Sequence, residues 1–81
     1  MIPLPIVDME KTGHNIERLR RSRGLRVADI QNMIGFTSPQ AVYKWEHGQS
    51  FPSLENLVAL SHIFGCTIED IIAVSYPQPY G

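Results

Sequence analysis

Four glycines divide the central part of the chain into short segments, and their spacing is the feature that most limits its fold. Each glycine follows a run in which apolar side chains recur three or four residues apart, which is typical of a helix with one buried face. Glycine is common directly after a helix because it readily adopts the left-handed conformation. The pattern therefore predicts short helices that end at Gly24, Gly35, Gly48 and Gly65.

Residues that favour helix starts precede these segments. Aspartate, serine and threonine side chains accept hydrogen bonds from the first N–H groups of a helix, and proline fits the first helical position. Thr67 and Asp70 have the spacing of a capping box, with aspartate in place of glutamate or glutamine. Because Gly13 weakens the first turn of the first helix, Asp8 and Thr12 are both candidate starts. The other candidate starts are Ser38 with Pro39, and Pro52 with Ser53.

These signals predict one compact all-α domain of five helices. A chain of 81 residues has the length of a single domain with a thin core. Pro3 and Pro5 prevent a helix at the start of the chain, and a strand pattern is possible only in the two termini. The expected segments are an extended N-terminal arm (1–8), a helical domain (9–75) with its second helix at about 27–34 and its third at about 38–47, and a flexible tail (76–81).

The composition argues against several kinds of site. Cys66 is the single cysteine, so no internal disulfide is expected, and it is interpreted as a small packed hydrophobic residue. His14, His47 and His62 are too scattered for a metal motif. No apolar run approaches the ~20 residues of a membrane span, and no secretion signal opens the chain. We expect a cytoplasmic protein that is not an enzyme, with no cofactor, metal or small-molecule ligand.

The basic residues are concentrated in one short stretch. The formal net charge is −1, which does not by itself suggest a nucleic-acid partner. However, five of the seven basic residues fall within positions 18–26. A chain whose net charge is slightly negative can therefore still have one basic surface. These arginines are Arg18, Arg20, Arg21, Arg23 and Arg26. A solvated helix face explains Arg18, Arg21 and Arg23 equally well.

The third expected helix separates its apolar and polar side chains. At 100° per residue, Ala41, Val42 and Trp45 lie on one side, where they are expected to pack in the core. A stripe at i, i+3, i+4 and i+7 on the other side contains Gln40, Tyr43, Lys44 and His47. Glutamine pairs with adenine in the major groove, and lysine pairs with guanine or a phosphate. A solvated face is the commoner interpretation of such a stripe, but two short helices joined by a tight turn favour a helix-turn-helix.

Residues in a characteristic order extend over about 14–74 and include Arg20, Gly35 and the run Lys44, Trp45 and Glu46. This ordered set resembles the phage repressor and Cro-like helix-turn-helix family, also called the XRE family. The resemblance implies a five-helix repressor-like DNA-binding domain whose third helix enters the major groove. It also implies a homodimer on a two-fold operator in double-stranded DNA, with a role in transcription regulation as a repressor. The matching residues are Arg20, Gly24, Leu25, Ile30, Ile34, Gly35, Val42, Lys44, Trp45, Glu46, Gly48, Pro52, Ser53, Leu54, Asn56, Leu57, Gly65 and positions 68–72.

The resemblance also assigns residues to DNA. Gln40 and Lys44 match positions that contact bases or phosphates, and their neighbours Thr37, Ser38 and Tyr43 are further candidates for base contacts. The candidates for contacts with the DNA backbone are Arg26, His47, Gln49 and Ser50. The matched structural ion pair is Arg20 with Glu46, which links the first helix to the end of the third.

Two positions depart from the family pattern. Relatives open the second helix with serine or threonine followed by a phosphate-binding glutamine, whereas this chain has Arg26 and Val27. Valine cannot make that contact, so Arg26 is the candidate that reaches the phosphate. One extra residue precedes Ser38, and Pro39 stands where relatives often have a base-reading side chain. The sequence specificity of the relatives therefore does not transfer to this chain.

Two alternatives stay open from the sequence alone. The same fold serves as a protein–protein adaptor or an antitoxin-like module, and a steep dependence of DNA binding on salt would distinguish a DNA reader from these. The termini are expected to form a dimer interface with the last helix, or else to pack together within one chain. Their apolar residues are Ile2, Leu4, Ile6, Val7, Ile72, Val74, Tyr76 and Tyr80.

Overall fold

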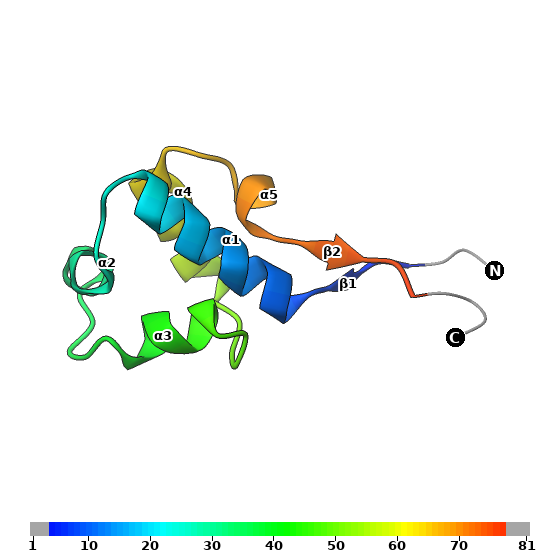
Figure 1. Ribbon diagram of the computed structural model, residues 1–81, viewed down its shortest axis with the longest axis horizontal. Coiled ribbons are helices and arrows are strands. Elements are labelled where there is room, and N and C mark those ends of the chain that lie inside the picture. The colour runs from blue at the N-terminus through cyan, green and yellow to red at the C-terminus, as the bar shows by residue number, and fades with distance from the viewer. Residues whose placement is uncertain (1–3, 78–81) are drawn as a thin grey trace.

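The computed structural model describes residues 4–77, which form five helices and a two-stranded antiparallel sheet (Figure 1). The all-α prediction is confirmed for the body of the molecule, and the small sheet is an addition to it. The helices are α1 (Met9–Ser22), α2 (Val27–Ile34), α3 (Gln40–Glu46), α4 (Leu54–Phe64) and α5 (Ile68–Ile71). The strands are β1 (Ile6–Val7) and β2 (Val74–Ser75).

Several helix ends form as the sequence predicts. The Asp8 carboxylate accepts the Lys11 N–H at 2.9 Å, and the Ser53 hydroxyl accepts the Asn56 N–H at 3.1 Å. The Thr67 N–H donates to the Asp70 carboxylate at 3.0 Å, and the Asp70 N–H donates to the Thr67 hydroxyl at 3.2 Å. These two bonds form the expected capping box at the start of α5. Hydrogen bonds that the carboxylate accepts from Thr67 lower the pKa of Asp70. The four glycines that end helices all have positive φ angles: Gly24, Gly35, Gly48 and Gly65.

The start of α3 differs from the sequence prediction. Ser38 does not cap the helix; Pro39 stands at the N-cap, and no side chain accepts a hydrogen bond there. Pro39 has a ψ angle of 0°, which falls short of the value of a full helical residue near −42°. The first helical hydrogen bond therefore runs from the Tyr43 N–H to the Pro39 carbonyl, at 3.1 Å. As a result α3 is shorter than the expected segment 38–47.

The core lies where α1, α3 and α4 meet, and α2 and α5 close it. In Figure 1, α3 lies along one side of α1, α2 lies at one end, and α4 and α5 cover the opposite side. Trp45 is buried, as expected, and Phe36 packs edge-on against its ring with centroids 5.7 Å apart. The buried apolar side chains are Ile16, Leu19, Val27, Ile30, Val42, Trp45, Leu57, Leu60, Phe64 and Ile71.

Gly13 allows α1 to lie directly against the end of α3. A Cβ atom at this position would approach the carbonyl oxygens of Trp45 and Glu46, the second at 2.7 Å. Both neighbours are backbone atoms, so they cannot turn away as a flexible side chain could. The glycine that seemed to weaken the first helix in the sequence is therefore the residue that brings the two helices together.

The two ends of the described chain pair with each other. Ile6 lies opposite Ser75 and Val7 lies opposite Val74 in β1 and β2. Below the strands, the Asp8 N–H donates to the Ala73 carbonyl at 2.8 Å. The Ala73 N–H donates to the buried Thr12 hydroxyl at 2.9 Å, and the Asn15 side chain donates to the Ile71 carbonyl at 3.0 Å. The arm thus pairs within one chain with residues 74–75, which were expected to belong to the helical domain and form a strand instead. The expected contributions of Ile2 and Tyr80 lie outside the described residues.

We predict that Gly13→Ala lowers the free energy of unfolding by about 1–3 kcal/mol, because the added methyl group overpacks the contact with α3. In an unconstrained helix the same change would stabilise by up to about 1 kcal/mol. Urea denaturation measures the difference, with His14→Ala as the control because His14 is an exposed neighbour in the same helix. A Gly13→Ala protein as stable as the unmodified protein would contradict the close approach.

Candidate nucleic-acid interface

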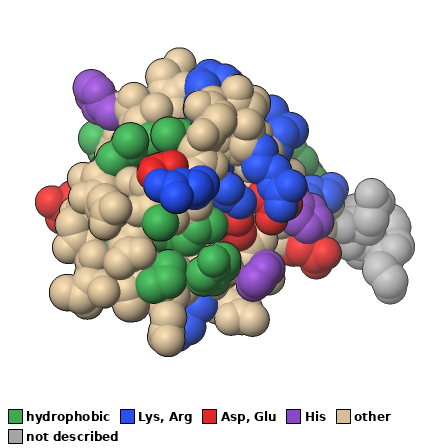
Figure 2. Space-filling view, turned by 60° about the vertical axis from the view of Figure 1, so that its left-hand side comes forward, with side chains coloured by type: hydrophobic (Ala, Val, Ile, Leu, Met, Phe, Trp, Pro, Cys, Tyr) green, Lys and Arg blue, Asp and Glu red, His purple; other side chains and the backbone are tan. Residues whose placement is uncertain are grey.

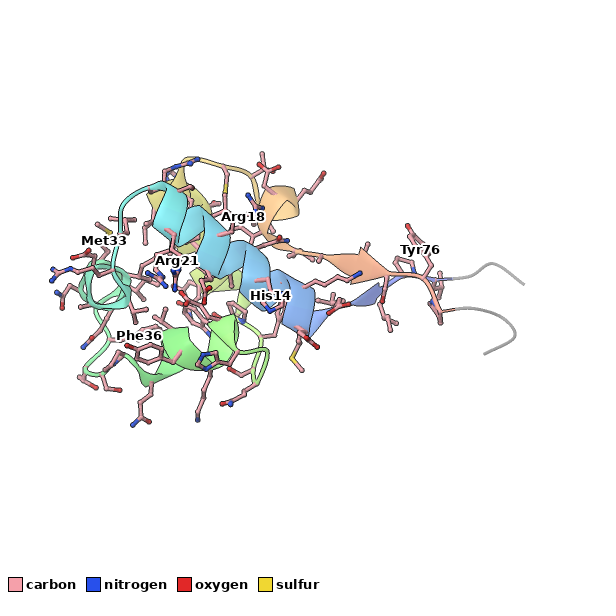
Figure 3. The ribbon with its side chains drawn as sticks, viewed as in Figure 1. His14, Arg18, Arg21, Met33, Phe36 and Tyr76 are labelled. Carbon is pink, nitrogen blue, oxygen red and sulfur yellow. The ribbon has the colours of Figure 1, made fainter. Side chains whose placement is uncertain are left out.

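One side of α3 is fixed in the core and the other side is free. Val42 is fully buried, and Trp45 and Glu46 are only 4% exposed. The stripe predicted from the sequence lies on the opposite side: Gln40, Tyr43, Lys44 and His47 are all exposed. In Figure 3, side chains of α3 project away from α1 into solvent. A helix held in this way can present its polar stripe to a surface as large as DNA.

The polar groups of this stripe are available to a ligand. Among the residues that the structure describes, neither the Gln40 amide nor the Lys44 ammonium group has a hydrogen-bond or ion-pair partner. The Tyr43 and His47 rings stack on each other with centroids 6.3 Å apart and 16° between their planes. The stripe therefore combines two hydrogen-bonding side chains that have no partner among the described residues with one stacked aromatic pair.

The remaining candidates flank this helix. Thr37 and Ser38 are exposed in the connection before α3, and Gln49 is exposed after it, whereas Ser50 is half-buried. The Gln49 and Ser50 N–H groups donate to the Lys44 carbonyl, at 2.8 and 3.4 Å, so this loop folds back on the end of α3. Thr37 and Ser38 therefore lie before the start of α3, and Gln49 and Ser50 lie after its end.

Arg20 and Glu46 form a paired contact beneath this surface. Arg20 Nε lies 2.7 Å from Glu46 Oε2, and Arg20 Nη2 lies 3.1 Å from Glu46 Oε1. The side chains are 11% and 3% exposed, and hydrogen bonding to the carboxylate raises the pKa of Arg20. Arg20 Nη1 also donates to the Leu25 carbonyl at 2.9 Å. One guanidinium group thus joins α1, the connection to α2 and the end of α3.

At the start of α2, Arg26 already has a partner. Its guanidinium group lies 3.1 Å from the Asp29 carboxylate, and its N–H donates to the same carboxylate at 2.7 Å. This pair is exposed, and hydrogen bonding to Arg26 lowers the pKa of Asp29. A phosphate that binds Arg26 would therefore share the guanidinium group with the Asp29 carboxylate. Val27, which stands where relatives have the phosphate-binding glutamine, is a buried core residue.

The arginines of α1 have different roles. Arg18 and Arg21 are exposed, and Arg21 lies 3.6 Å from Glu17 (Figure 3). Arg23 Nε donates to the Phe64 carbonyl at 2.7 Å and so stabilises the end of α4. The sequence gives no signal for this contact because the two residues are 41 positions apart. Figure 2 shows Lys and Arg side chains gathered in a band on this side of the molecule, with acidic side chains among them.

Other candidate chemistry is sparse in residues 4–77. Cys66 is half-buried against the core, as interpreted from the sequence, and burial raises the pKa of its thiol. Within this range no three histidine, cysteine or acidic side chains are grouped as metal ligands would be. None of the helices in the same range has the length and apolar character to cross a membrane.

Comparison with known proteins places these features in a family. A family model described as helix-turn-helix matches residues 16–71. The HTH-type transcriptional regulator y4dJ of Sinorhizobium fredii is 30% identical over 76 residues, which cover 93% of this chain and 97% of that protein. By contrast, the chain covers 28% of the transcriptional activator BcrR of Enterococcus faecalis and 47% of the transcriptional regulator DdrOP3 of Deinococcus deserti, at 28% and 34% identity.

Solved structures show the same fold. The P22 c2 repressor in complex with a synthetic operator is 32% identical, with a TM-score of 0.68 over 74% of this chain and 89% of that chain. The restriction-modification controller protein C.AhdI of Aeromonas hydrophila is 25% identical, with a TM-score of 0.71 over 79% of this chain and 96% of that chain. The expected five-helix fold thus agrees with repressor and controller proteins of known structure.

We predict that Glu46→Ala lowers the free energy of unfolding by about 3–5 kcal/mol, because it leaves the Arg20 charge buried without its partner. The double variant Arg20→Met, Glu46→Leu is expected to lose much less, since it removes both charges. Thermal unfolding of the three proteins measures the difference. If Glu46→Ala melts within about 2 °C of the unmodified protein, the pair does not hold α3 in place.

Proposed function

The chain belongs to the helix-turn-helix family, and we propose that it binds double-stranded DNA in a sequence-specific manner as a transcriptional regulator that acts as a repressor. One observation carries the proposal: α3 is fixed on its apolar side by buried contacts, while on its free side the Gln40 amide and the Lys44 ammonium group have no partner within residues 4–77. A rigid helix with such groups fits the width of the major groove.

Within this proposal each residue of the α3 surface has an assigned contact. Gln40 pairs with the edge of an adenine, and Lys44 pairs with a guanine or a phosphate. Tyr43, Ser38 and Thr37 contact neighbouring bases. The groups that contact the DNA backbone are Arg26, His47, Gln49 and Ser50. Backbone contacts position α3 in the groove, and base contacts select the sequence.

The charge of the chain is compatible with this partner. A net charge of −1 gives little attraction at long range, so the binding energy depends on where the positive groups lie. Lys44 and the exposed arginines are near the proposed DNA surface or on the adjoining helix, and each cation that neutralises a phosphate releases a counterion. We therefore expect DNA binding whose affinity falls steeply as the salt concentration rises.

The proposed binding unit is a two-fold homodimer. One α3 contacts only a few base pairs, and a chain of near-neutral charge gains little from non-specific attraction. Two copies related by a dyad present two recognition helices about 34–36 Å apart, which is one turn of DNA. A DNA partner places the protein in the cytoplasm, and the proposal includes no catalytic step.

Gln40→Ala is expected to weaken DNA binding by about 1–3 kcal/mol and to relax selectivity at one base pair, because it removes a paired base contact. Lys44→Ala, if the lysine binds a phosphate, should weaken binding to all sequences and lower the salt slope by about one. Fluorescence anisotropy with labelled duplexes at several salt concentrations measures both effects. Neither variant should change the melting temperature, since both side chains are exposed.

Lys11→Ala is the matched control, because Lys11 is also exposed but lies on α1. Selection of bound sites from random DNA supplies the duplexes, and a two-fold symmetric motif is the expected result. Unchanged binding in both α3 variants would place the DNA surface elsewhere. Absence of any salt-dependent DNA binding would favour the adaptor alternative.

A further inference from the structure

Asp29 accepts hydrogen bonds from both the backbone and the side chain of Arg26 at the start of α2. Its Oδ2 atom accepts the Arg26 backbone N–H at 2.7 Å and lies 3.4 Å from Arg26 Nε. Its Oδ1 atom accepts from Arg26 Nη2 at 3.1 Å. The carboxylate therefore lies along the edge of the guanidinium group that Nε and Nη2 form.

The backbone on both sides of Arg26 is fixed relative to α3. The Leu25 carbonyl accepts from Arg20, whose guanidinium group also binds Glu46 at the end of α3. On the other side of Arg26, Val27 is 8% exposed and belongs to the core. Arg26 thus keeps its freedom mainly in its side chain, and Asp29 is the residue that restrains this side chain.

The contact with Asp29 leaves part of the Arg26 guanidinium group free. A guanidinium group has five N–H donors in a rigid planar fork. Asp29 occupies the edge formed by Nε and Nη2, and Nη1 has no hydrogen-bond partner within residues 4–77. The Arg26 side chain is 81% exposed. The outer edge of the group, formed by Nη1 and Nη2, can therefore bind two oxygens of one phosphate.

The side-chain contact between Arg26 and Asp29 contributes orientation more than stability. An exposed ion pair adds little to the free energy of unfolding because water and salt screen it. Ordering a long side chain costs rotamer entropy, and a contact that orders it in the free protein removes this cost from the binding step. The pair thus prepares Arg26 for a ligand at one defined place beside α2.

We propose that Asp29 is a positioning residue that sets the selectivity for DNA, because it holds the Arg26 guanidinium group where one phosphate of a correctly bound site lies. Asp29 acts through Arg26 and itself touches no DNA. When α3 makes its base contacts, the phosphate meets the outer edge of an arginine that is already oriented. On an unrelated sequence these base contacts do not form, so the phosphates lie elsewhere and the oriented arginine gains less. This inference rests on the proposed function and deepens it.

The test compares DNA of selected and unrelated sequence by fluorescence anisotropy. The measured quantity is the ratio of the dissociation constant for an unrelated duplex to that for the selected duplex. Loss of the Asp29 charge strengthens the attraction to any phosphate, and the ratio cancels this general effect. Asp29→Asn is expected to lower the ratio at least about fivefold, because Arg26 is then free to follow the phosphates of any sequence.

Two further substitutions serve as references for Asp29→Asn. Asp29→Glu retains a carboxylate that can reach Arg26, so it should keep the ratio within about threefold of that of the unmodified protein. Glu69→Gln is the matched control, because Glu69 is an exposed acidic residue in the first turn of α5. It should leave the ratio within about twofold.

Arg26→Lys guards against a loss of helix structure. It keeps the positive charge and the bond between Asp29 and the backbone N–H, but an ammonium group has no planar fork. It is expected to lower the ratio about as much as Asp29→Asn does. In an Arg26→Ala background, Asp29→Asn should change the ratio less than about twofold, because the residue through which Asp29 acts is gone. Circular dichroism checks that every variant keeps its helices.

The inference is overturned if Asp29→Asn and Arg26→Lys both leave the ratio unchanged, or if Glu69→Gln lowers it as much. It is also overturned if the effect of Asp29→Asn persists in the Arg26→Ala background, since Asp29 would then act through the stability of α2. An unchanged ratio together with weakened binding in Gln40→Ala refutes the role of Asp29 alone. A protein that binds neither duplex refutes the proposed function as well.

Discussion

The Arg20–Glu46 pair is the interaction on which the rest of the structure depends. Its guanidinium group binds a carboxylate at the end of α3 and a carbonyl in the connection to α2, so three segments share one charged contact. A buried charge pair is costly to desolvate and is retained where its geometry fixes a unique arrangement. Gly13 makes the pair possible, because it lets α1 lie against the backbone carbonyl groups of Trp45 and Glu46 at the end of α3.

This fixed contact between α1 and α3 separates two surfaces with different chemistry. The free side of α3 is polar, and its side chains are held by a short helix whose other side is buried. The paired strands β1 and β2 expose apolar side chains, and they are anchored to α1 by the Thr12 hydroxyl and by the backbone of Asp8. Because α1 also holds α3 in place, the polar surface and the strand pair keep a defined relation within one chain. Such preorganisation lowers the cost of ordering a recognition helix on DNA.

Local signals predict much of this fold, whereas contacts between distant residues do not show in the sequence. The glycines after α1, α2 and α4 and the caps at Asp8, Ser53 and Thr67 depend on neighbours within a few positions, and they form as expected. The cap at Ser38 fails because the backbone angle of Pro39 moves the first helical bond. The contact of Arg23 with the Phe64 carbonyl joins residues 41 positions apart, and the contact of Thr12 with the Ala73 N–H joins residues 61 positions apart. Contacts over such separations leave no local pattern in the sequence. Helical periodicity predicted the polar stripe of α3, and the family resemblance implied the Arg20–Glu46 pair and the contacts of α3 with DNA, which stay predictions.

The central claim is that the free side of α3, carried by a two-fold dimer, reads DNA. Backbone amide chemical shifts, followed by NMR while a selected two-fold duplex is added, test it most directly. The account predicts that the largest shifts fall within residues 37–50 and at Arg26, with one set of signals for two equivalent copies and a stoichiometry of two chains per duplex. Shifts confined to α4 or to the strands β1 and β2, or one chain bound per duplex, would contradict it.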